Sequence, residues 1–307
     1  MAIVPTDIPM TSALCAQTID SLARRYPAIA AEALTTTAFG RPVLALTIGN
    51  GGRKVLYSAA HHANEWITAP VLLKFLEELA QAAEAGGTIF GVPAQTIFNA
   101  ATIYAVPMVD PDGVDLVTGA IEPGTQEYET GRALADNYPE IPFPNGWKAN
   151  LLGVDLNLQY PAGWLRAREI KFAQGFTRPG PRDYVGRAPL NQRESIALAR
   201  YTEEVGPDLV IAFHTQGEVI YWQFGDIIVP GARALAEEFS RLSGYALEGT
   251  PYASSFAGYK DWFIQNWLRP GFTIESGLGE SPLPLSQFPE IYQANLGILV
   301  TAATGLP

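Results

Sequence analysis

The stretch "KVLYSAAHHANEW", residues 54–66, joins an apolar run to a cluster of polar side chains. A continuous apolar run of this length, placed after the glycine pair 51–52, predicts a short strand that is buried on both faces. Two adjacent histidines, His61 and His62, follow the run directly, and Glu65 comes three residues after the second. The chain contains three histidines in all, so two of them occur where this strand ends. We therefore predict a strand whose carboxyl end carries the chemistry of the protein.

The same arrangement occurs at two other places in the chain. The apolar run 208–213 ends at His214, and the run 271–274 ends at Glu275. In open α/β sheets, ligands bind in the crevice beyond the carboxyl ends of the strands. We therefore expect His62, His214 and Glu275 to converge on one crevice.

The rest of the chain alternates between helical and extended segments. Helices are predicted over residues 11–27, 69–85, 192–205, 231–244 and 288–303, and further strands over residues 41–50 and 102–109. The "DPDG" run, residues 110–113, is predicted to be a turn, and two proline- and glycine-rich segments, 122–148 and 178–189, are predicted to be long surface loops. This alternation indicates an α/β fold with a mainly parallel sheet covered on both faces. Since no repeat or linker interrupts it, we predict one domain over residues 1–307.

The composition excludes several classes of protein. Of the 307 residues, 48% are hydrophobic and 17% are charged, which supplies ample material for a core. The net charge of −11 argues against binding to nucleic acids or anionic membranes. Cys15 is the single cysteine, so no internal disulfide can form. The first 20 residues lack the features of a signal peptide, and no apolar stretch approaches the roughly 20 residues that span a bilayer. We predict a soluble, cytoplasmic protein without membrane insertion, and the sequence leaves its oligomeric state open.

The donor types around the first strand end predict a metal site. His62 and Glu65 leave the strand in a tight turn, so both side chains can approach one ion, and His214 can complete the set from another strand. Two imidazoles and one carboxylate form a three-ligand zinc site that leaves a position for water. Such a site is typical of catalysis, because structural zinc sites are normally closed by four protein ligands. We predict one zinc ion per chain, although sequence alone does not separate zinc from other divalent ions.

Five motifs make a family resemblance specific. "HHANEW", "VPMVDPDGV", "GVDLN", "AFHTQGE" and "FTIESG" occur in the order and setting of the zinc carboxypeptidase family, and the resemblance covers essentially the whole chain. It implies that His62, Glu65 and His214 hold zinc and that Glu275 is the catalytic glutamate. It also implies a mixed, mostly parallel sheet with helices on both faces. Zinc lowers the pKa of bound water to about 7, and Glu275 is expected to take the proton as general base and return it to the leaving amine as general acid.

The chain departs from this family at the groups that bind a free C-terminal carboxylate. Asn157 is kept, but Leu158 stands where the family carries an arginine, and Asn64 replaces the arginine between the ligands. Leucine cannot hold a carboxylate by two parallel hydrogen bonds. Lys148 stands where family members carry arginines, one of which polarises the scissile carbonyl. We therefore assign Asn157 to substrate binding and Lys148 to the oxyanion or the substrate.

A second resemblance narrows the branch of the family. Residues 153–186, with "AGYKDWFIQ" at 257–265, resemble the bacterial γ-D-glutamyl-L-diamino acid endopeptidases, which cut cell-wall peptides between D-glutamate and diaminopimelate or lysine. This implies a peptidoglycan-derived peptide as substrate. Since the sequence shows neither cell-wall-binding repeats nor a signal peptide, we expect imported or recycled muropeptides to be trimmed. Arg182 is the first candidate to pair with one of its displaced carboxylates. The family also uses a loop tyrosine before an Asp-Trp pair, and the spacing favours Tyr252 over Tyr259.

Three other functions remain open at this point. A conventional carboxypeptidase would need a guanidinium near Asn157 supplied from elsewhere in the chain. A metal-dependent deacylase of N-acyl amino acids would need a narrow, closed pocket. An inactive peptidoglycan-binding module is disfavoured by the intact ligand set and by Glu275, because a binding module needs no general base. Asp155 and Asp261 are interpreted as structural, and His61 as a residue behind the metal site.

Overall fold

The central sheet carries the strand ends that the sequence predicts to be functional. In the structure, a computed structural model that describes residues 2–305, an eight-stranded sheet has the order β1-β2-β6-β3-β7-β10-β8-β9. Its strands are β1 (Ala30–Thr36), β2 (Pro42–Gly49), β3 (Arg53–Ala59), β6 (Ala101–Val106), β7 (Leu209–His214), β8 (Val219–Tyr221), β9 (Ala246–Glu248) and β10 (Gly271–Glu275). A separate two-stranded ribbon pairs β4 (Thr88–Ile89) with β5 (Val92–Pro93).

The sheet is mixed, with a parallel centre. Strands β6, β3, β7 and β10 are parallel neighbours, whereas β1, β2 and β6 pair antiparallel, as do β10 and β8. Strand β9 pairs parallel to β8. The predicted α/β fold with a mixed, mostly parallel sheet is therefore confirmed. Strands β2 and β3 lie on either side of the glycine pair 51–52 in the sequence but are not neighbours in the sheet, because β6 lies between them.

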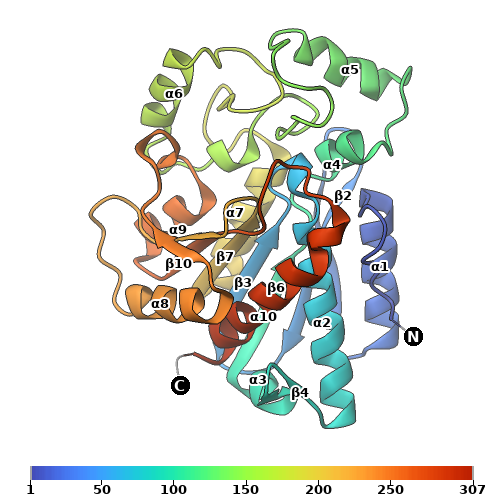
Figure 1. Cartoon of the computed structure of the whole chain (residues 1–307), viewed down its shortest axis with the longest axis vertical. Helices are drawn as coiled ribbons and strands as arrows, with labels where there is room; N and C mark the ends of the chain where they lie inside the picture. The colour runs from blue at the N-terminus through green and yellow to red at the C-terminus, as the bar shows by residue number, and fades with distance from the viewer. Residues whose placement is uncertain (1, 306–307) are drawn as a thin grey trace.

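Helices cover both faces of this sheet (Figure 1). One face packs against α1 (Ser12–Arg25), α2 (Thr68–Ala85), α8 (Ala232–Ser243) and α10 (Phe288–Thr304). The other face packs against α7 (Arg193–Val205) and α9 (Tyr259–Trp267). The short α3 (Ala94–Ala100) packs on α10 and α2. Near the carboxyl ends of the central strands lie α4 (Pro111–Thr118), α5 (Gln126–Ala135) and α6 (Trp164–Ala173) (Figure 1).

Strand β3 illustrates why the central strands are apolar along their whole length. Tyr57 faces the α2 and α10 layer, where its hydroxyl donates to the carbonyl oxygen of Leu299 at 2.8 Å and its ring meets the edge of Phe75. Leu56 faces the opposite layer and joins the core formed with α7 and α9. Because both faces are buried, neither side of the strand needs polar residues.

Two predictions on the loops were wrong. The "DPDG" run is the beginning of α4, where the Asp110 carboxylate caps the helix by accepting from the Gly113 N–H at 3.0 Å and Pro111 occupies the first turn. The segment 122–148, predicted to be irregular, contains α5. This helix lies on the surface with two buried residues, Gly131 and Ala135, so the sequence has little apolar periodicity to reveal it.

Between residues 2 and 305, no helix is long and apolar enough to cross a bilayer.

Candidate metal centre and cleft

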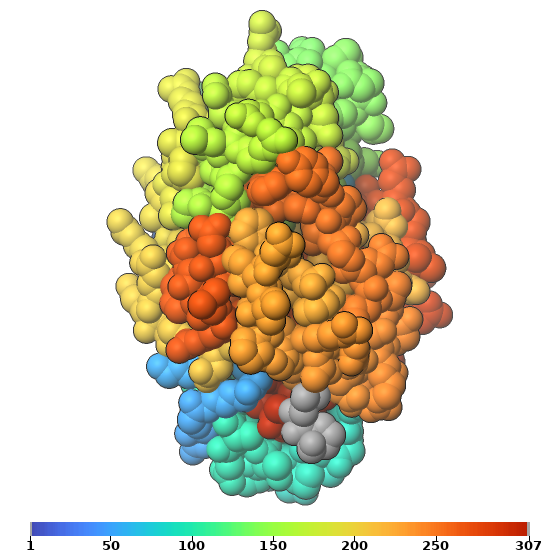
Figure 2. Space-filling view, turned by 90° about the vertical axis from the view of Figure 1, so that its left-hand side faces the viewer, coloured from blue at the N-terminus to red at the C-terminus, as the bar shows by residue number. Residues whose placement is uncertain are grey.

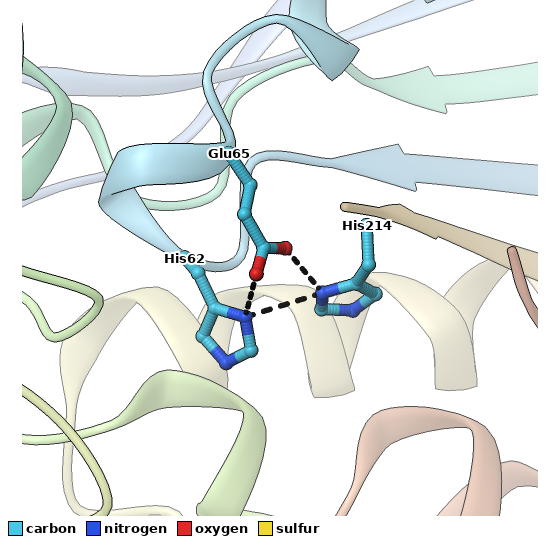
Figure 3. Close-up of side chains that lie close together, drawn as sticks. All are labelled: His62, Glu65 and His214. Atoms are coloured by element: carbon cyan, nitrogen blue, oxygen red, sulfur yellow. Dashed lines mark hydrogen bonds and ion pairs between the residues drawn. The ribbon is translucent and has the colours of Figure 1, made fainter. Parts of the chain in front are cut away.

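The ends of β3 and β7 bring three metal-ligating side chains together. These strands are parallel neighbours, so their carboxyl ends lie side by side. After β3, Ala60 adopts a left-handed φ of 46° and turns the chain, and its N–H donates to Thr68 Oγ1 at 3.0 Å. His62 follows, Glu65 ends a one-turn 3₁₀ helix, and His214 is the last residue of β7. Figure 3 shows the three side chains pointing toward one another.

The distances fit a single metal ion. The Glu65 carboxylate lies 2.9 Å from His62 Nδ1 through one oxygen and 2.8 Å from His214 Nδ1 through the other. The two Nδ1 atoms are 3.3 Å apart. Two nitrogen ligands of one tetrahedral zinc ion, each at 2.0–2.1 Å, are separated by about 3.3 Å. Among residues 2–305, His62, Glu65 and His214 form the one group of three potential metal ligands whose donor atoms all lie within 4.8 Å of one another. The donor set therefore suits one zinc ion.

Asp155 holds the His62 ring from the side away from the other donors. Its Oδ1 lies 3.2 Å from His62 Nε2, and the same carboxylate accepts from the main-chain N–H groups of Asn157 and Asp183. Burial opposes protonation, but the carboxylates of Glu65 and Asp155 raise the pKa of His62 to about 9. A carboxylate on the outer nitrogen of a ligating histidine fixes its ring orientation and increases its basicity. Asp155 therefore supports the metal site as well as the main chain.

His61 lies behind this site, as predicted. Its side chain is fully buried, and its ring stacks on His214 with the centroids 5.5 Å apart. Its Nε2 lies 3.4 Å from the Tyr160 hydroxyl. Burial lowers the pKa of His61 well below its usual value, so the ring is neutral and adds no charge beside the ligands.

Glu275 ends β10, the next strand in the sheet. It is paired in register with His214, so its side chain emerges next to the metal centre. Burial raises the pKa of Glu275 above its usual value, with a further contribution from the charge of Glu65. A carboxylate with a raised pKa beside an activated water is suited to accept a proton and to release it again.

A cleft with two arms opens at these strand ends. The inner arm, with a volume of about 210 Å³, runs from His62 past Asn157 to Lys260 and Asp261. The outer arm, with a volume of about 420 Å³, is lined by Asn64 and by loop residues on the other side. Four residues line both arms and mark the point at which the arms meet: Lys148, Arg182, Tyr221 and Glu275.

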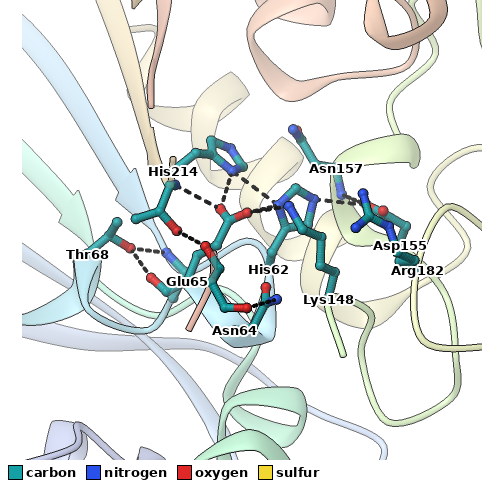
Figure 4. Close-up of polar contacts among 12 residues, drawn as sticks. His62, Asn64, Glu65, Thr68, Lys148, Asp155, Asn157, Arg182 and His214 are labelled. Carbon is teal, nitrogen blue, oxygen red and sulfur yellow. Dashed lines mark hydrogen bonds and ion pairs between the residues drawn. The ribbon is translucent and has the colours of Figure 1, made fainter. Parts of the chain in front are cut away.

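Both cations that the sequence singles out for the substrate, Lys148 and Arg182, lie at this junction (Figure 4). Lys148 Nζ donates to Glu65 Oε1 at 2.7 Å, and this carboxylate raises the pKa of Lys148 against the opposing effect of burial. Arg182 Nε donates to Asp183 Oδ2 at 2.7 Å, while its side chain remains 41% exposed. The other N–H groups of the Arg182 guanidinium are therefore available to a substrate.

The residues expected to read a C-terminal carboxylate have a different arrangement. The Asn157 side-chain oxygen accepts from the Tyr259 main-chain N–H at 3.0 Å, and its side chain lines the inner arm. Leu158 lines the same arm, so an apolar surface faces the substrate where the family has a guanidinium. Tyr259 is fully buried, and its hydroxyl pairs with Thr202 at 2.8 Å.

Tyr252, the loop tyrosine that the spacing favours, lines neither arm of the cleft in this structure. It is 61% exposed, and its hydroxyl accepts from Arg166 Nε at 2.9 Å and from Arg166 Nη2 at 2.8 Å. The residues that line the inner arm from this segment are its neighbours Thr250, Pro251 and Ser254. Tyr252 begins η3 (Tyr252–Ser254), which contacts α6. In Figure 2, the yellow-green segment that contains α6 lies above the orange segment that contains η3.

Several residues that line the cleft were not predicted from the sequence as site residues. Lys260, which is 4% exposed, donates to the Gln223 carbonyl oxygen at 2.6 Å and forms an ion pair with Asp261. Asp261 was interpreted as structural, yet both members of this pair line the inner arm. Tyr221 lies on β8, a strand of three residues that is too short to give a clear pattern.

Comparisons with known proteins agree with this arrangement. Residues 15–296 match the zinc carboxypeptidase family. The chain is 45% identical over 282 residues to gamma-D-glutamyl-L-diamino acid endopeptidase 1 of Lysinibacillus sphaericus, a match that covers 92% of the chain and 69% of that protein. It is 39% identical over 276 residues to the uncharacterized protein YqgT of Bacillus subtilis (strain 168), covering 89% and 72% of the two chains.

The solved structure of carboxypeptidase A from Helicoverpa armigera has the same fold. It superposes with a TM-score of 0.72 at 18% identity, covering 98% of this chain and 75% of that one. The family match extends over nearly the whole chain and includes the residues of the metal centre. With a His-Glu-His donor set that suits one zinc ion, the chain belongs to the zinc carboxypeptidase family of metallopeptidases.

Proposed function

We propose that this chain hydrolyses the bond between γ-D-glutamate and diaminopimelate, or lysine, in peptides derived from bacterial peptidoglycan. The observation that carries the proposal is the pair of cations, Lys148 and Arg182, at the junction of the two arms beside Glu275. A γ-linked D-glutamate leaves its α-carboxylate free beside the scissile amide, so a cation at this junction has an anion to bind. The 45% identity to the Lysinibacillus sphaericus endopeptidase supports the same substrate class.

The proposed chemistry needs few groups from the protein. Zinc, when bound by His62, Glu65 and His214, supplies an activated water as nucleophile. Glu275 accepts the proton of this water and delivers it to the amine of the diamino acid as the C–N bond breaks. The products are L-alanyl-D-glutamate and a diamino acid with a free amine. Lys148 is placed to stabilise the negative charge that develops on the γ-carbonyl oxygen.

The inner arm suits a substrate residue that carries charges at its far end. It reaches Lys260 and Asp261, a buried pair of opposite charge. Lys260 uses two of its three N–H donors on Gln223 and Asp261, which leaves one donor for a ligand. Diaminopimelate ends in both an ammonium and a carboxylate, whereas lysine ends in an ammonium alone. We therefore propose that diaminopimelate is preferred over lysine.

A conventional carboxypeptidase is the second candidate function. The observation in its favour is that Arg182 lines the same arm as Asn157, so a guanidinium is present near the amide although Leu158 is apolar. The two connected arms, of about 210 and 420 Å³, do not form the narrow, closed pocket expected of a small-molecule deacylase.

The experiment is hydrolysis of defined peptides with identification of the products by mass spectrometry. The set contains L-Ala-γ-D-Glu-diaminopimelate, its lysine counterpart, and ordinary peptides that end in Phe, Leu, Lys or Arg. We expect cleavage after γ-D-glutamate, faster with diaminopimelate, and little trimming of the ordinary peptides. Efficient trimming of ordinary peptides, with the γ-D-glutamyl peptides left intact, would establish the carboxypeptidase alternative. Glu275→Gln is the control for contaminating peptidases.

The domain organisation and the cellular location are proposed from the sequence. We propose that residues 1–307 act as one catalytic domain on muropeptides in the cytoplasm. Cell fractionation followed by activity measurement tests the location, and activity confined to the secreted fraction would contradict it.

A further inference from the structure

We propose that Tyr221 supplies a fixed hydroxyl group that contacts a substrate carboxylate beside the scissile bond, a role for which the sequence favours Tyr252. The inference rests on the proposed peptidase function and adds a specificity-determining residue to it. It depends on the sheet register, on the position of Tyr221 in the cleft, and on the partners of the two hydroxyl groups.

The register of β8 on β10 fixes the direction of the Tyr221 side chain. Tyr221 pairs directly with Thr273 in this antiparallel ladder, and Val219 pairs with Glu275. Directly opposed residues project to the same face of a sheet, as do residues two apart on one strand. Tyr221 therefore stands on the same face as Glu275, in the diagonal position that aromatic side chains can span. Ile220, which alternates with it, is fully buried in the core on the other face.

The position of Tyr221 in the cleft is the junction of the two arms. It is one of the four residues that line both arms, together with Lys148, Arg182 and Glu275. A peptide that occupies both arms must pass this point, and the scissile bond must lie there for Glu275 to reach it. Tyr221 is thus the neutral hydrogen-bond donor in a set that otherwise contains two cations and the proposed general base.

The hydroxyl groups of the two tyrosines differ in their availability. No hydrogen bond within the described residues engages the Tyr221 hydroxyl, and burial raises its pKa, with further contributions from Glu275 and Glu248. The group therefore stays protonated and is a donor at neutral pH. The Tyr252 hydroxyl accepts two N–H groups from Arg166, and Tyr252 lines neither arm of the cleft. A hydroxyl on a sheet strand also needs no loop movement to meet the substrate.

The test compares Tyr221→Phe with Tyr252→Phe and with a matched control. The control is Tyr104→Phe on β6, a half-buried sheet tyrosine whose ring packs against Tyr201 of α7 and which lines neither arm of the cleft. Zinc content and melting temperature establish that each variant is folded. For L-Ala-γ-D-Glu-diaminopimelate, Tyr221→Phe is expected to lower kcat/KM by about 10- to 150-fold, the range for a lost hydrogen bond to a charged group. Tyr104→Phe is expected to leave it unchanged.

A second readout separates substrate contact from a structural role. The same variants are assayed on peptides in which the γ-D-glutamyl α-carboxylate, or the carboxylate next to the cleaved amine, is converted to an amide. If Tyr221 binds one of these carboxylates, amidation of that group should reduce the penalty of Tyr221→Phe to less than about 3-fold. An unchanged penalty on both amidated peptides, or a large loss in Tyr252→Phe with none in Tyr221→Phe, would overturn the proposal.

Failure of the proposed function is recognised separately. Wild-type enzyme that does not cleave the γ-D-glutamyl peptide contradicts the function rather than the role of Tyr221. Wild type and Tyr221→Phe are then compared on the ordinary peptide that the wild type does cleave. In that peptide the C-terminal carboxylate is the group that Tyr221 would contact. The same loss is expected in Tyr221→Phe, and equal rates in wild type and variant would overturn the role.

Discussion

The two walls of the cleft are built in different ways. The strand wall, defined as His62, His214 and Glu275, projects from or directly beyond the ends of β3, β7 and β10, three neighbouring parallel strands. The loop wall, defined as Lys148, Asn157 and Arg182, lies on segments between α5 and α7. Strand ends are positioned by the ladder of the sheet, whereas loop residues depend on a few individual contacts.

The loop wall is nevertheless held by main-chain hydrogen bonds. The N–H groups of Lys148 and Ala149 both donate to the Pro181 carbonyl oxygen, at 2.7 and 2.9 Å. The Asp155 N–H donates to the Tyr184 carbonyl oxygen at 2.9 Å. The two loop segments therefore support each other. We therefore propose that the strand wall holds the metal and the general base, and that the loop wall selects the substrate, with Lys148 also stabilising the developing oxyanion.

The largest expected effect is the loss of the metal from the strand wall. His214→Ala removes one of three ligands, so we expect near-complete loss of bound zinc by metal analysis. Arg182→Ala changes the loop wall and is the matched control, which should retain one zinc ion per chain. Full zinc stoichiometry in His214→Ala would show that the metal lies elsewhere.

The next effect separates chemistry from metal binding within the strand wall. Glu275→Gln keeps the shape of the side chain and removes its ability to accept a proton. Turnover should fall by at least about 10²-fold, the lower range for a lost general base, with zinc content and melting temperature unchanged. Near-normal turnover in the folded variant would assign the base to another residue.

A smaller effect, confined to the substrate, is expected for the loop wall. Arg182→Ala removes a charge-assisted contact, so kcat/KM on the γ-D-glutamyl peptide should fall by about 10- to 150-fold. The effect on an uncharged model amide should be much smaller. Equal losses on both substrates would mean that Arg182 supports the site structurally and does not select the substrate.

The smallest effect on turnover is expected at Glu194, which lies in the first turn of α7 and lines neither arm of the cleft, so its replacement should change stability instead. Burial raises the pKa of Glu194 from its ordinary value of 4.5 to about 7, with a contribution from Asp112. The folded protein therefore keeps a proton that the unfolded chain releases, and the resulting stabilisation is lost as the pH rises from 4.5 through 7.

Glu194→Gln removes this ionisation and should gain stability relative to the wild type as the pH rises. The difference in unfolding free energy should change by on the order of 3 kcal/mol between pH 4 and pH 8. Urea unfolding of both proteins at the two pH values measures it. Parallel pH dependence of the two proteins would place the raised pKa on another group.

The same difference between the walls explains what the sequence could predict. A strand end is visible because a buried apolar run stops abruptly at a polar residue, as at His214 and Glu275. The fold class follows from the same runs. The position of Tyr221 was not visible, because its strand is short and its direction depends on pairing with a strand 50 residues later.

The loop wall was only partly predictable. Arg182 and Lys148 were singled out from the motifs around them, but nothing in the sequence indicated that both line the junction of two arms. The spacing of Tyr252 along the chain did not reveal that its hydroxyl pairs with Arg166. Lys260 and Asp261 form a buried pair only once α9 packs on the sheet, so their proximity to the inner arm depends on tertiary structure.

The most direct test of the proposed selection uses two isomeric substrates. L-Ala-γ-D-Glu-diaminopimelate and L-Ala-α-D-Glu-diaminopimelate contain the same residues and differ only in which glutamyl carboxyl group forms the amide. If the loop wall binds the displaced α-carboxylate, kcat/KM should favour the γ isomer by at least about 10-fold, and Arg182→Ala should reduce this preference. Equal rates for the two isomers, or a preference for the α isomer, would contradict the assignment of this chain as a γ-D-glutamyl endopeptidase.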